Sequence, residues 1–178
     1  NKEFYINSIE KSESRKKAPA PFTTSSMQID AIRKLGMTAE RVSAAAQGVY
    51  MAGLTSYIRT DSVTMSEDAL NAAETQIKTE FGDKFSQKKQ HQTKSKNSQE
   101  SHECIRPSYF DKHEIEGTSD EQRLYELIWK RAVASQMSDC ILDKTVISIG
   151  YKGLKEEFIC RGETIKFEGF MKVYTEST

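Results

Sequence analysis

The spacing of hydrophobic residues changes twice along this chain of 178 residues. Residues 2–9 are rich in β-forming side chains and show no helical repeat, whereas the middle of the chain repeats its apolar residues at helical spacing. From residue 141 onward the period falls to two, in short runs separated by glycines and charged residues. This order predicts an α+β fold, in which a helical domain is inserted between two parts of an antiparallel β domain.

Start and stop signals place four helices in the middle of the chain. Each expected helix begins near a hydroxyl residue that can accept a hydrogen bond from the first turn, and glycines end three of them. The expected starts are Ser25 or Ser26, Thr38, Ser66 and Ser119, and the expected stops are Gly36, Gly53 and Gly82. The last helix carries the clearest apolar stripe, formed by Tyr125, Ile128, Trp129, Ala132, Val133 and Met137.

These changes of period divide the chain into three stretches. Residues 1–19 and 140–178 are predicted to be the two parts of the β domain, and residues 20–139 the helical domain. The polar residues 10–21, which include two prolines, are expected to be a connector. The C-terminal stretch is expected to hold four short strands, TVISIGYK, EEFICRG, ETIKFEG and FMKVYT. The chain is expected to leave the β domain, form the helices and then return, and these two crossings between the domains predict a hinge.

Composition excludes several classes of protein. The 26 Lys+Arg balance the 26 Asp+Glu, so a nucleic-acid site has to be local rather than spread over the surface. No run approaches the roughly 18 apolar residues that a membrane span needs. The three cysteines are far apart and odd in number, which argues against disulfides and a zinc site and favours a reducing compartment. Because the chain starts at Asn1 without a methionine, we expect it to be a piece of a longer protein.

The segment GLTSYIRTDS, at 53–62, holds the side chains best suited to chemistry. If it is extended, Thr55, Tyr57, Arg59 and Asp61 share one face. An arginine favours the anion of a neighbouring phenol and can hold a phosphodiester by two parallel hydrogen bonds. Tyr57 and Arg59 therefore form a candidate unit for attack on a phosphate. The alternative is an edge strand in which Tyr57 packs and Arg59 pairs with Asp61.

A second cluster lies in ESHECIRPS, at 100–108. His102 and Arg106 are four residues apart, so a helical turn that ends before Pro107 would place them on one side. An imidazole beside a guanidinium suits contact with a phosphate, and the imidazole can also transfer a proton near neutral pH. The alternative is a capped turn with a surface histidine.

Two other functions stay open at this point, a non-catalytic DNA-binding module and a structural domain in which Tyr57 packs. The helices on either side of Gly36 and Thr38 resemble a helix-turn-helix, although only Arg41 and Gln47 of the second helix are strong base-reading types. The composition of the lysine-rich stretch at 83–99 favours a solvated loop over a nucleic-acid contact.

Three segments, in order along the chain, resemble type IA DNA topoisomerases, the family of bacterial DNA topoisomerase I. GLTSYIRTDSVTMSEDAL is similar to the family's active-site segment, and PAPFTTSSMQIDAIRKLGMTAERVSAAAQGVYMAGL to the segment before it. NSQESHECIRPS resembles the family's H-E-x-I-R-P segment, and LYELIWKRAVASQM and the closing strands also fit. The resemblance covers nearly the whole chain and favours the catalytic interpretation.

The resemblance implies a role for each matched residue. Tyr57 falls on the nucleophilic tyrosine, and Arg59 on the arginine that contacts the scissile phosphate. Asp61 falls on the acidic residue two positions further on. His102 falls on a histidine implicated in DNA binding, and Arg106 lies in the same segment, so we expect Asp61, His102 and Arg106 to contribute to DNA binding together with Arg59.

The resemblance also implies a reaction, a cofactor and partners. In this family the tyrosine breaks one strand as a 5′-phosphotyrosine, another strand passes, and the 3′-hydroxyl reseals the break, which relaxes negative supercoils without ATP. The Mg²⁺ cofactor is held by an N-terminal Toprim domain of the same polypeptide, and we expect no metal site within this chain. Expected partners are single-stranded or negatively supercoiled DNA and that Toprim domain, with no membrane. We expect a monomer in the bacterial cytoplasm, associated with the nucleoid, and no activity from the isolated chain.

Overall fold

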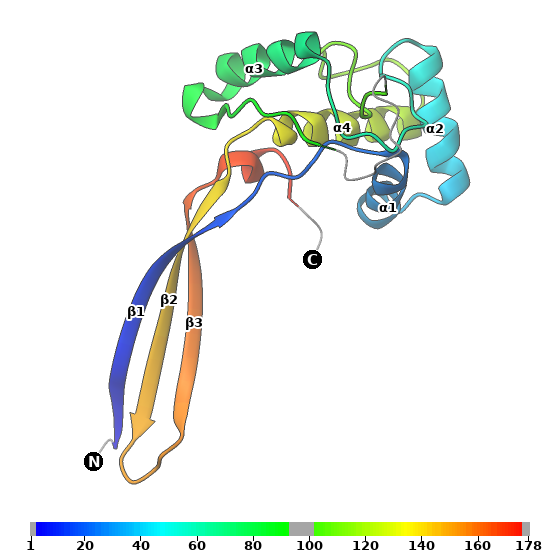
Figure 1. The fold of residues 1–178 in the computed structure, drawn as a ribbon. Helices are drawn as coiled ribbons and strands as arrows, with labels where there is room; N and C mark the ends of the chain where they lie inside the picture. Colours follow the sequence, from blue (N-terminus) through cyan, green and yellow to red (C-terminus); the bar gives the residue numbers. More distant parts are fainter. Residues whose placement is uncertain (1–2, 93–101, 176–178) are drawn as a thin grey trace. The chain divides into compact units, whose positions relative to one another are not determined.

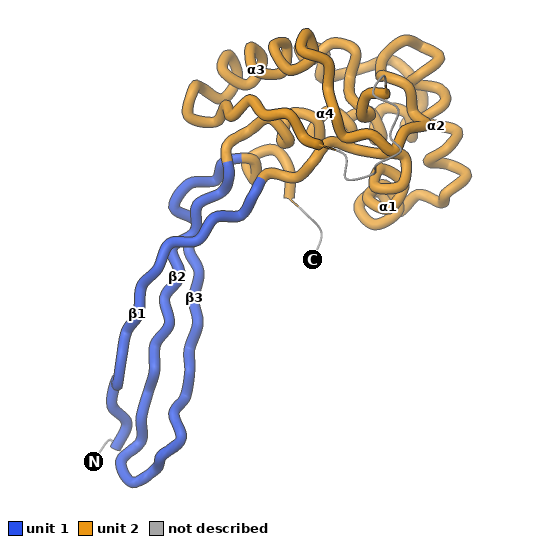
Figure 2. Tube along the Cα trace, in the orientation of Figure 1, with its two compact units in different colours: residues 1–17, 139–169 blue, residues 18–138, 170–178 orange. Residues whose placement is uncertain are grey.

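The computed structural model describes residues 3–92 and 102–175. The chain folds as two compact units, one formed by residues 1–17 and 139–169, the other by residues 18–138 and 170–178 (Figure 2). The first unit is an antiparallel sheet and the second is helical, so the predicted α+β class is confirmed. No helix in the described part of the chain is both long enough and apolar enough to span a bilayer.

The β unit is a single sheet of three strands in the order β1-β2-β3 (Figure 1). The strands are β1 (Phe4–Lys16), β2 (Cys140–Tyr151) and β3 (Glu157–Phe167). β1 runs well past the strand predicted at 2–9, so the connector predicted at 10–21 is wrong over its first half. The polar residues of 10–16 pair with β2 and are mostly exposed, so they show no apolar alternation that would reveal a strand.

The C-terminal stretch differs from the four short strands that were predicted. EEFICRG and ETIKFEG form one continuous strand, β3, in which Gly162 lies opposite Thr145 of β2. FMKVYT is not a strand: it contributes to the short 3-10 helix η2 (Gly169–Lys172). Phe170 and Tyr174 are buried and belong to the helical unit, where the Tyr174 hydroxyl accepts from Arg131 Nη1 at 2.8 Å. The predicted β part at 140–178 is therefore too long.

The helical unit contains four α-helices and the short 3-10 helix η1 (Asp83–Phe85) among the described residues. The α-helices are α1 (Thr24–Leu35), α2 (Ala39–Met51), α3 (Glu67–Phe81) and α4 (Ser119–Ser135). Thr38 and Ser66 cap α2 and α3 as predicted. The cap of α1 is Thr23 rather than Ser25 or Ser26, since the hydroxyl of Thr23 accepts from the Ser26 N–H. Gly36 ends α1 in the left-handed conformation, at φ 63°.

Helix α4 forms the core of the helical unit and contacts α1, α2 and α3. All six residues of its predicted stripe are buried, which confirms that prediction. Its aromatic side chains also hold the preceding loop: the Trp129 indole N–H donates to the Phe110 carbonyl at 2.8 Å, and the Tyr125 hydroxyl donates to the Lys112 carbonyl at 2.5 Å. The core thereby fixes the backbone that follows the 102–108 segment.

Candidate active site

The segment 53–62 is irregular rather than an edge strand. Its one described β-bridge joins Thr55 to Pro107. Thr55 is buried, so it does not share a face with Tyr57 and Arg59 as predicted, whereas these two residues and Asp61 are exposed. The reason is that the backbone of this segment bonds to two different neighbouring segments, which interrupts the regular alternation of a strand.

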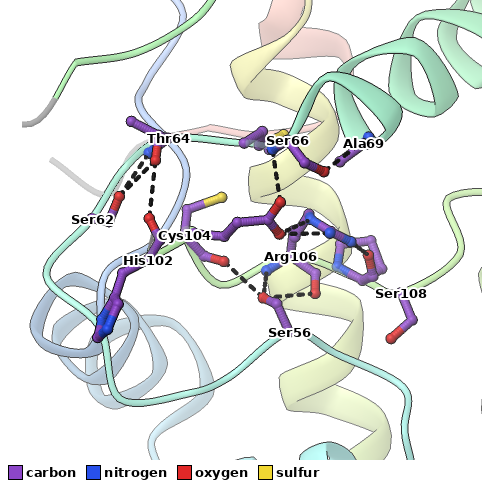
Figure 3. Close-up of polar contacts among 12 residues, drawn as sticks. Ser56, Ser62, Thr64, Ser66, Ala69, His102, Cys104, Arg106 and Ser108 are labelled. Atoms are coloured by element: carbon purple, nitrogen blue, oxygen red, sulfur yellow. Dashed lines mark hydrogen bonds and ion pairs between the residues drawn. The ribbon is translucent and has the colours of Figure 1, made fainter. Parts of the chain in front are cut away.

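The first half of the segment is held by residues 104–108. The Ser56 N–H donates to the Arg106 carbonyl at 2.9 Å, and the Arg106 N–H donates to the Ser56 Oγ, also at 2.9 Å. The Ser56 hydroxyl donates in turn to the Cys104 carbonyl at 2.7 Å (Figure 3). The Ser108 N–H donates to the Leu54 carbonyl at 2.9 Å. Both the backbone and the side chain of the residue before Tyr57 are therefore fixed.

The second half of the segment is held by Thr24, the first residue of α1. The Thr24 hydroxyl donates to the Ile58 carbonyl at 2.7 Å and accepts from the Thr60 N–H at 2.8 Å. The Thr24 N–H donates to the Thr60 carbonyl at 2.9 Å. Tyr57 and Arg59 thus project from backbone that is fixed on both sides. Thr24 was not among the predicted site residues, because its partners Ile58 and Thr60 lie 34 and 36 residues away in the sequence.

Tyr57 lies at the edge of a cavity. Its side chain is 50% exposed, and its ring packs edge-on against the ring of Tyr50, with centroids 5.3 Å apart. The cavity measures about 330 Å³ and is lined by Ser56, Tyr57, Thr60, His102 and Glu103. A half-exposed phenol beside an open cavity is accessible to a polymer, which a phenol packed in the core is not.

Arg59 carries a charge that no carboxylate neutralises within the described part of the chain. Neither Arg59 nor Asp61 forms an ion pair with any residue of 3–92 or 102–175, including each other. The alternative in which Arg59 pairs with Asp61 therefore finds no support. An exposed guanidinium without a counter-charge, two residues from an exposed phenol, can bind a phosphate by two parallel hydrogen bonds.

The predicted helical turn that would bring His102 and Arg106 together is absent. Residues 102–107 are irregular, with a β-bridge from Ile105 to Phe22. Backbone pairing with Phe22 and the following Pro107 both oppose a helix here. His102 is exposed and lines the Tyr57 cavity, whereas Arg106 points elsewhere (Figure 3). The sequence placed both residues near the site, but it paired them wrongly.

Arg106 instead forms an ion pair inside the protein. Its Nη2 and Nε lie 2.5 and 2.8 Å from the Glu103 Oε2, and its side chain is only 17% exposed. The other oxygen, Glu103 Oε1, accepts from the Ser66 N–H at the start of α3, at 2.8 Å. Partial burial raises the pKa of Glu103, but the Ser66 hydrogen bond and the Arg106 charge outweigh it and hold that pKa below its usual value. Glu103 was not among the predicted site residues.

The remaining candidates carry little chemistry. Arg41, the main base-reading candidate of α2, is held by Asp120 through its Nε at 2.8 Å and its Nη2 at 2.6 Å. Burial raises the pKa of the Cys104 thiol to about 12, so this cysteine stays protonated at neutral pH. Over residues 3–92 and 102–175, no three side chains of His, Cys, Asp or Glu come together as a possible metal site. The loop at 83–99 lies partly outside the described residues.

Comparison with known proteins identifies the family that shares this architecture. A family model described as DNA topoisomerase matches residues 1–178. DNA topoisomerase 1 of Streptomyces coelicolor is 41% identical over 184 residues, which cover 99% of this chain and 19% of that protein. DNA topoisomerase 1 of Rickettsia bellii is 38% identical over 192 residues, covering 98% and 24%. Full-length topoisomerase I from Thermotoga maritima matches with a TM-score of 0.84 at 28% identity, covering 98% of this chain and 30% of that one.

These matches and the α+β architecture define the class of protein. The chain belongs to the bacterial type IA DNA topoisomerase family. It spans 19% and 24% of the length of the two curated relatives described above.

Proposed function

We propose that this chain is the part of a type IA topoisomerase that carries the nucleophile for strand cleavage, Tyr57. The observation that supports this most directly is the exposure of Tyr57 and Arg59 on backbone that is fixed on both sides, with Tyr57 lining the 330 Å³ cavity. Fixed backbone reduces the reorganisation needed before attack, and exposure admits a DNA strand. His102, which lines the same cavity, is proposed to contact that DNA, and Asp61 is proposed to lie beside the same strand.

The proposed cleavage exchanges one phosphate ester for another. The phenolic oxygen of Tyr57 forms a bond to phosphorus, and the bond between phosphorus and the 3′-oxygen breaks. The phenol loses a proton and the leaving oxygen gains one, so a 5′-phosphotyrosine and a 3′-hydroxyl result. Arg59 holds the non-bridging oxygens and stabilises the charge that develops on them. Because an ester is conserved, resealing needs no ATP.

The whole enzyme is proposed to need more than this chain. Mg²⁺, held by a Toprim domain elsewhere in the polypeptide, would stabilise the charge on the attacking and leaving oxygens. The second strand is proposed to pass when the helical unit and the β unit move relative to each other. The substrate is proposed to be single-stranded or negatively supercoiled DNA, in the bacterial nucleoid, with the enzyme acting as a monomer.

The polarity of the covalent adduct tests this function. Full-length topoisomerase, meaning the polypeptide that carries this chain and the remaining domains, is incubated with a single-stranded oligonucleotide and quenched with detergent. A label at the 3′ end of the DNA should migrate with the protein, whereas a label at the 5′ end should appear on a shorter free fragment. A 5′ label that stays on the protein would contradict the proposed linkage.

We expect the isolated chain of 178 residues to leave a negatively supercoiled plasmid unrelaxed in the presence of Mg²⁺. The reason is that it would supply Tyr57 and Arg59 but not the metal-binding groups of the Toprim domain. Agarose-gel electrophoresis of the plasmid measures the result, with the full-length enzyme as the positive control. Relaxation by the isolated chain would show that these residues suffice.

A further inference from the structure

Glu103 and Arg106 connect three segments that meet beside the candidate nucleophile. The Arg106 carbonyl accepts from the N–H of Ser56, the residue that precedes Tyr57, and the Arg106 N–H donates to the Ser56 hydroxyl oxygen. The Arg106 side chain is bound by Glu103 Oε2, and Glu103 Oε1 accepts from the Ser66 N–H. A continuous path of hydrogen bonds and one ion pair therefore runs from the start of α3 to the residue next to Tyr57.

The side-chain pair also determines the local backbone. Segment 102–107 has no helix or long strand to set its conformation, so an ion pair between residues three apart restrains the turn that joins them. That turn presents the Cys104 and Arg106 carbonyls to Ser56. With side chains 17% and 27% exposed, Arg106 and Glu103 are shielded enough that losing either partner leaves an uncompensated charge.

We infer that Glu103 and Arg106 are positioning residues, whose ion pair holds Ser56 in place and thereby orients Tyr57. This inference rests on the proposed function. This replaces the role in DNA contact that the sequence suggested for Arg106. A guanidinium bound through two nitrogens to one carboxylate oxygen has few donors left for a phosphate, and it additionally donates from Nη1 to the Pro107 carbonyl at 3.1 Å.

The test compares covalent adduct formation with DNA binding in the full-length enzyme. Glu103→Gln and Arg106→Gln should each slow adduct formation at saturating DNA by about 10- to 100-fold, as small misplacements of a reacting group do. The double variant should be no slower than either single variant, because the two residues act as a unit. Affinity for single-stranded DNA and its salt dependence should stay unchanged, since neither side chain is proposed to touch a phosphate.

Opposite results would overturn the inference. If Arg106 contacts a phosphate, Arg106→Gln should weaken binding and lower the slope of log affinity against log salt by about 0.7, while Glu103→Gln should not slow cleavage. If the rate losses of the two single variants added up in the double variant, this would also contradict the inference that Glu103 and Arg106 act as one ion pair. Arg106→Lys provides a milder variant if the glutamine variants do not fold. It should slow adduct formation less than Arg106→Gln, because lysine keeps the charge of the ion pair but not the two donors of the guanidinium. Equal losses in these two variants would count against the ion pair.

Two controls separate this inference from the proposed function. Arg41→Gln breaks another arginine–carboxylate pair of the helical unit, which Arg41 forms with both side-chain oxygens of Asp120, and should leave adduct formation unchanged. Tyr57→Phe should abolish the adduct if the proposed function is right. If Tyr57→Phe abolishes the adduct and both glutamine variants retain the normal rate, only the positioning role of Glu103 and Arg106 is wrong. If Tyr57→Phe retains the adduct, the assignment of the nucleophile is wrong.

Discussion

Tyr57→Phe in the full-length enzyme should eliminate covalent protein–DNA adducts and plasmid relaxation while the protein stays folded. Removing an enzyme's nucleophile lowers its rate by at least about 10⁴-fold, because no other group takes its place. The fold should tolerate the change, since phenylalanine keeps the edge-on packing against Tyr50 and the ring is half exposed. Adducts are measured on a detergent gel with 3′-labelled DNA, and folding by thermal melting.

Tyr109 provides the matched control. It is 66% exposed, and among the described tyrosines of the helical unit only Tyr57 and Tyr109 have half or more of their surface exposed. Tyr109→Phe should retain both adduct formation and relaxation. If Tyr109→Phe abolished the adduct and Tyr57→Phe did not, the nucleophile would have to be reassigned, although the family membership of the chain would stand.

Arg59→Ala should give the second largest effect, slowing cleavage by about 10²- to 10³-fold, as the loss of a group that stabilises transition-state charge does. The guanidinium has no counter-charge in the described part of the chain, so its removal costs the fold little and affects mainly the phosphate. Arg59→Lys should slow cleavage less than Arg59→Ala, because lysine keeps the positive charge, although it cannot form the two parallel hydrogen bonds. Single-turnover cleavage of a labelled oligonucleotide measures both variants.

Arg161→Ala is a suitable control for Arg59→Ala, because Arg161 is an exposed arginine of β3 in the other unit. It should leave the cleavage rate unchanged. Normal cleavage by Arg59→Ala would show that the scissile phosphate is held by other groups. A loss of affinity with no loss of the saturated rate would make Arg59 a DNA contact without a role in the chemistry.

The local features of the helical unit could be predicted from the sequence because they depend on neighbours within about one or two helical turns. Thr38 and Ser66 cap their helices by bonding to the next turn, and Gly36 takes the left-handed conformation that glycine allows. Five of the six stripe residues lie in α4 and are buried because their spacing places them on one face, and the sixth, Met137, is buried just after the helix ends. Tyr57 and Arg59 are exposed on either side of the buried Ile58, although the predicted alternation fails at Thr55, which is buried.

The strands and the connections within the site were harder to predict. β1 extends through polar residues because a sheet with both faces exposed does not require an apolar alternation. Two predicted strands merge across Gly162, since this residue pairs in register with Thr145 of β2. Sequence patterns identify strands by buried faces and by turn residues, and both signals misled the prediction here.

The sequence by itself thus determined the α+β class, the helices and the residue types of the site, because these follow from short-range spacing and from motifs. Only the tertiary structure decided how the site is held: Thr24 bonds to Thr60, 36 residues away, and Ser56 bonds to Arg106, 50 residues away. It likewise paired Arg106 with Glu103 rather than leaving it beside His102. Hydrogen bonds between distant segments leave no periodic trace in a single sequence, because their partners are set by the way the helices pack.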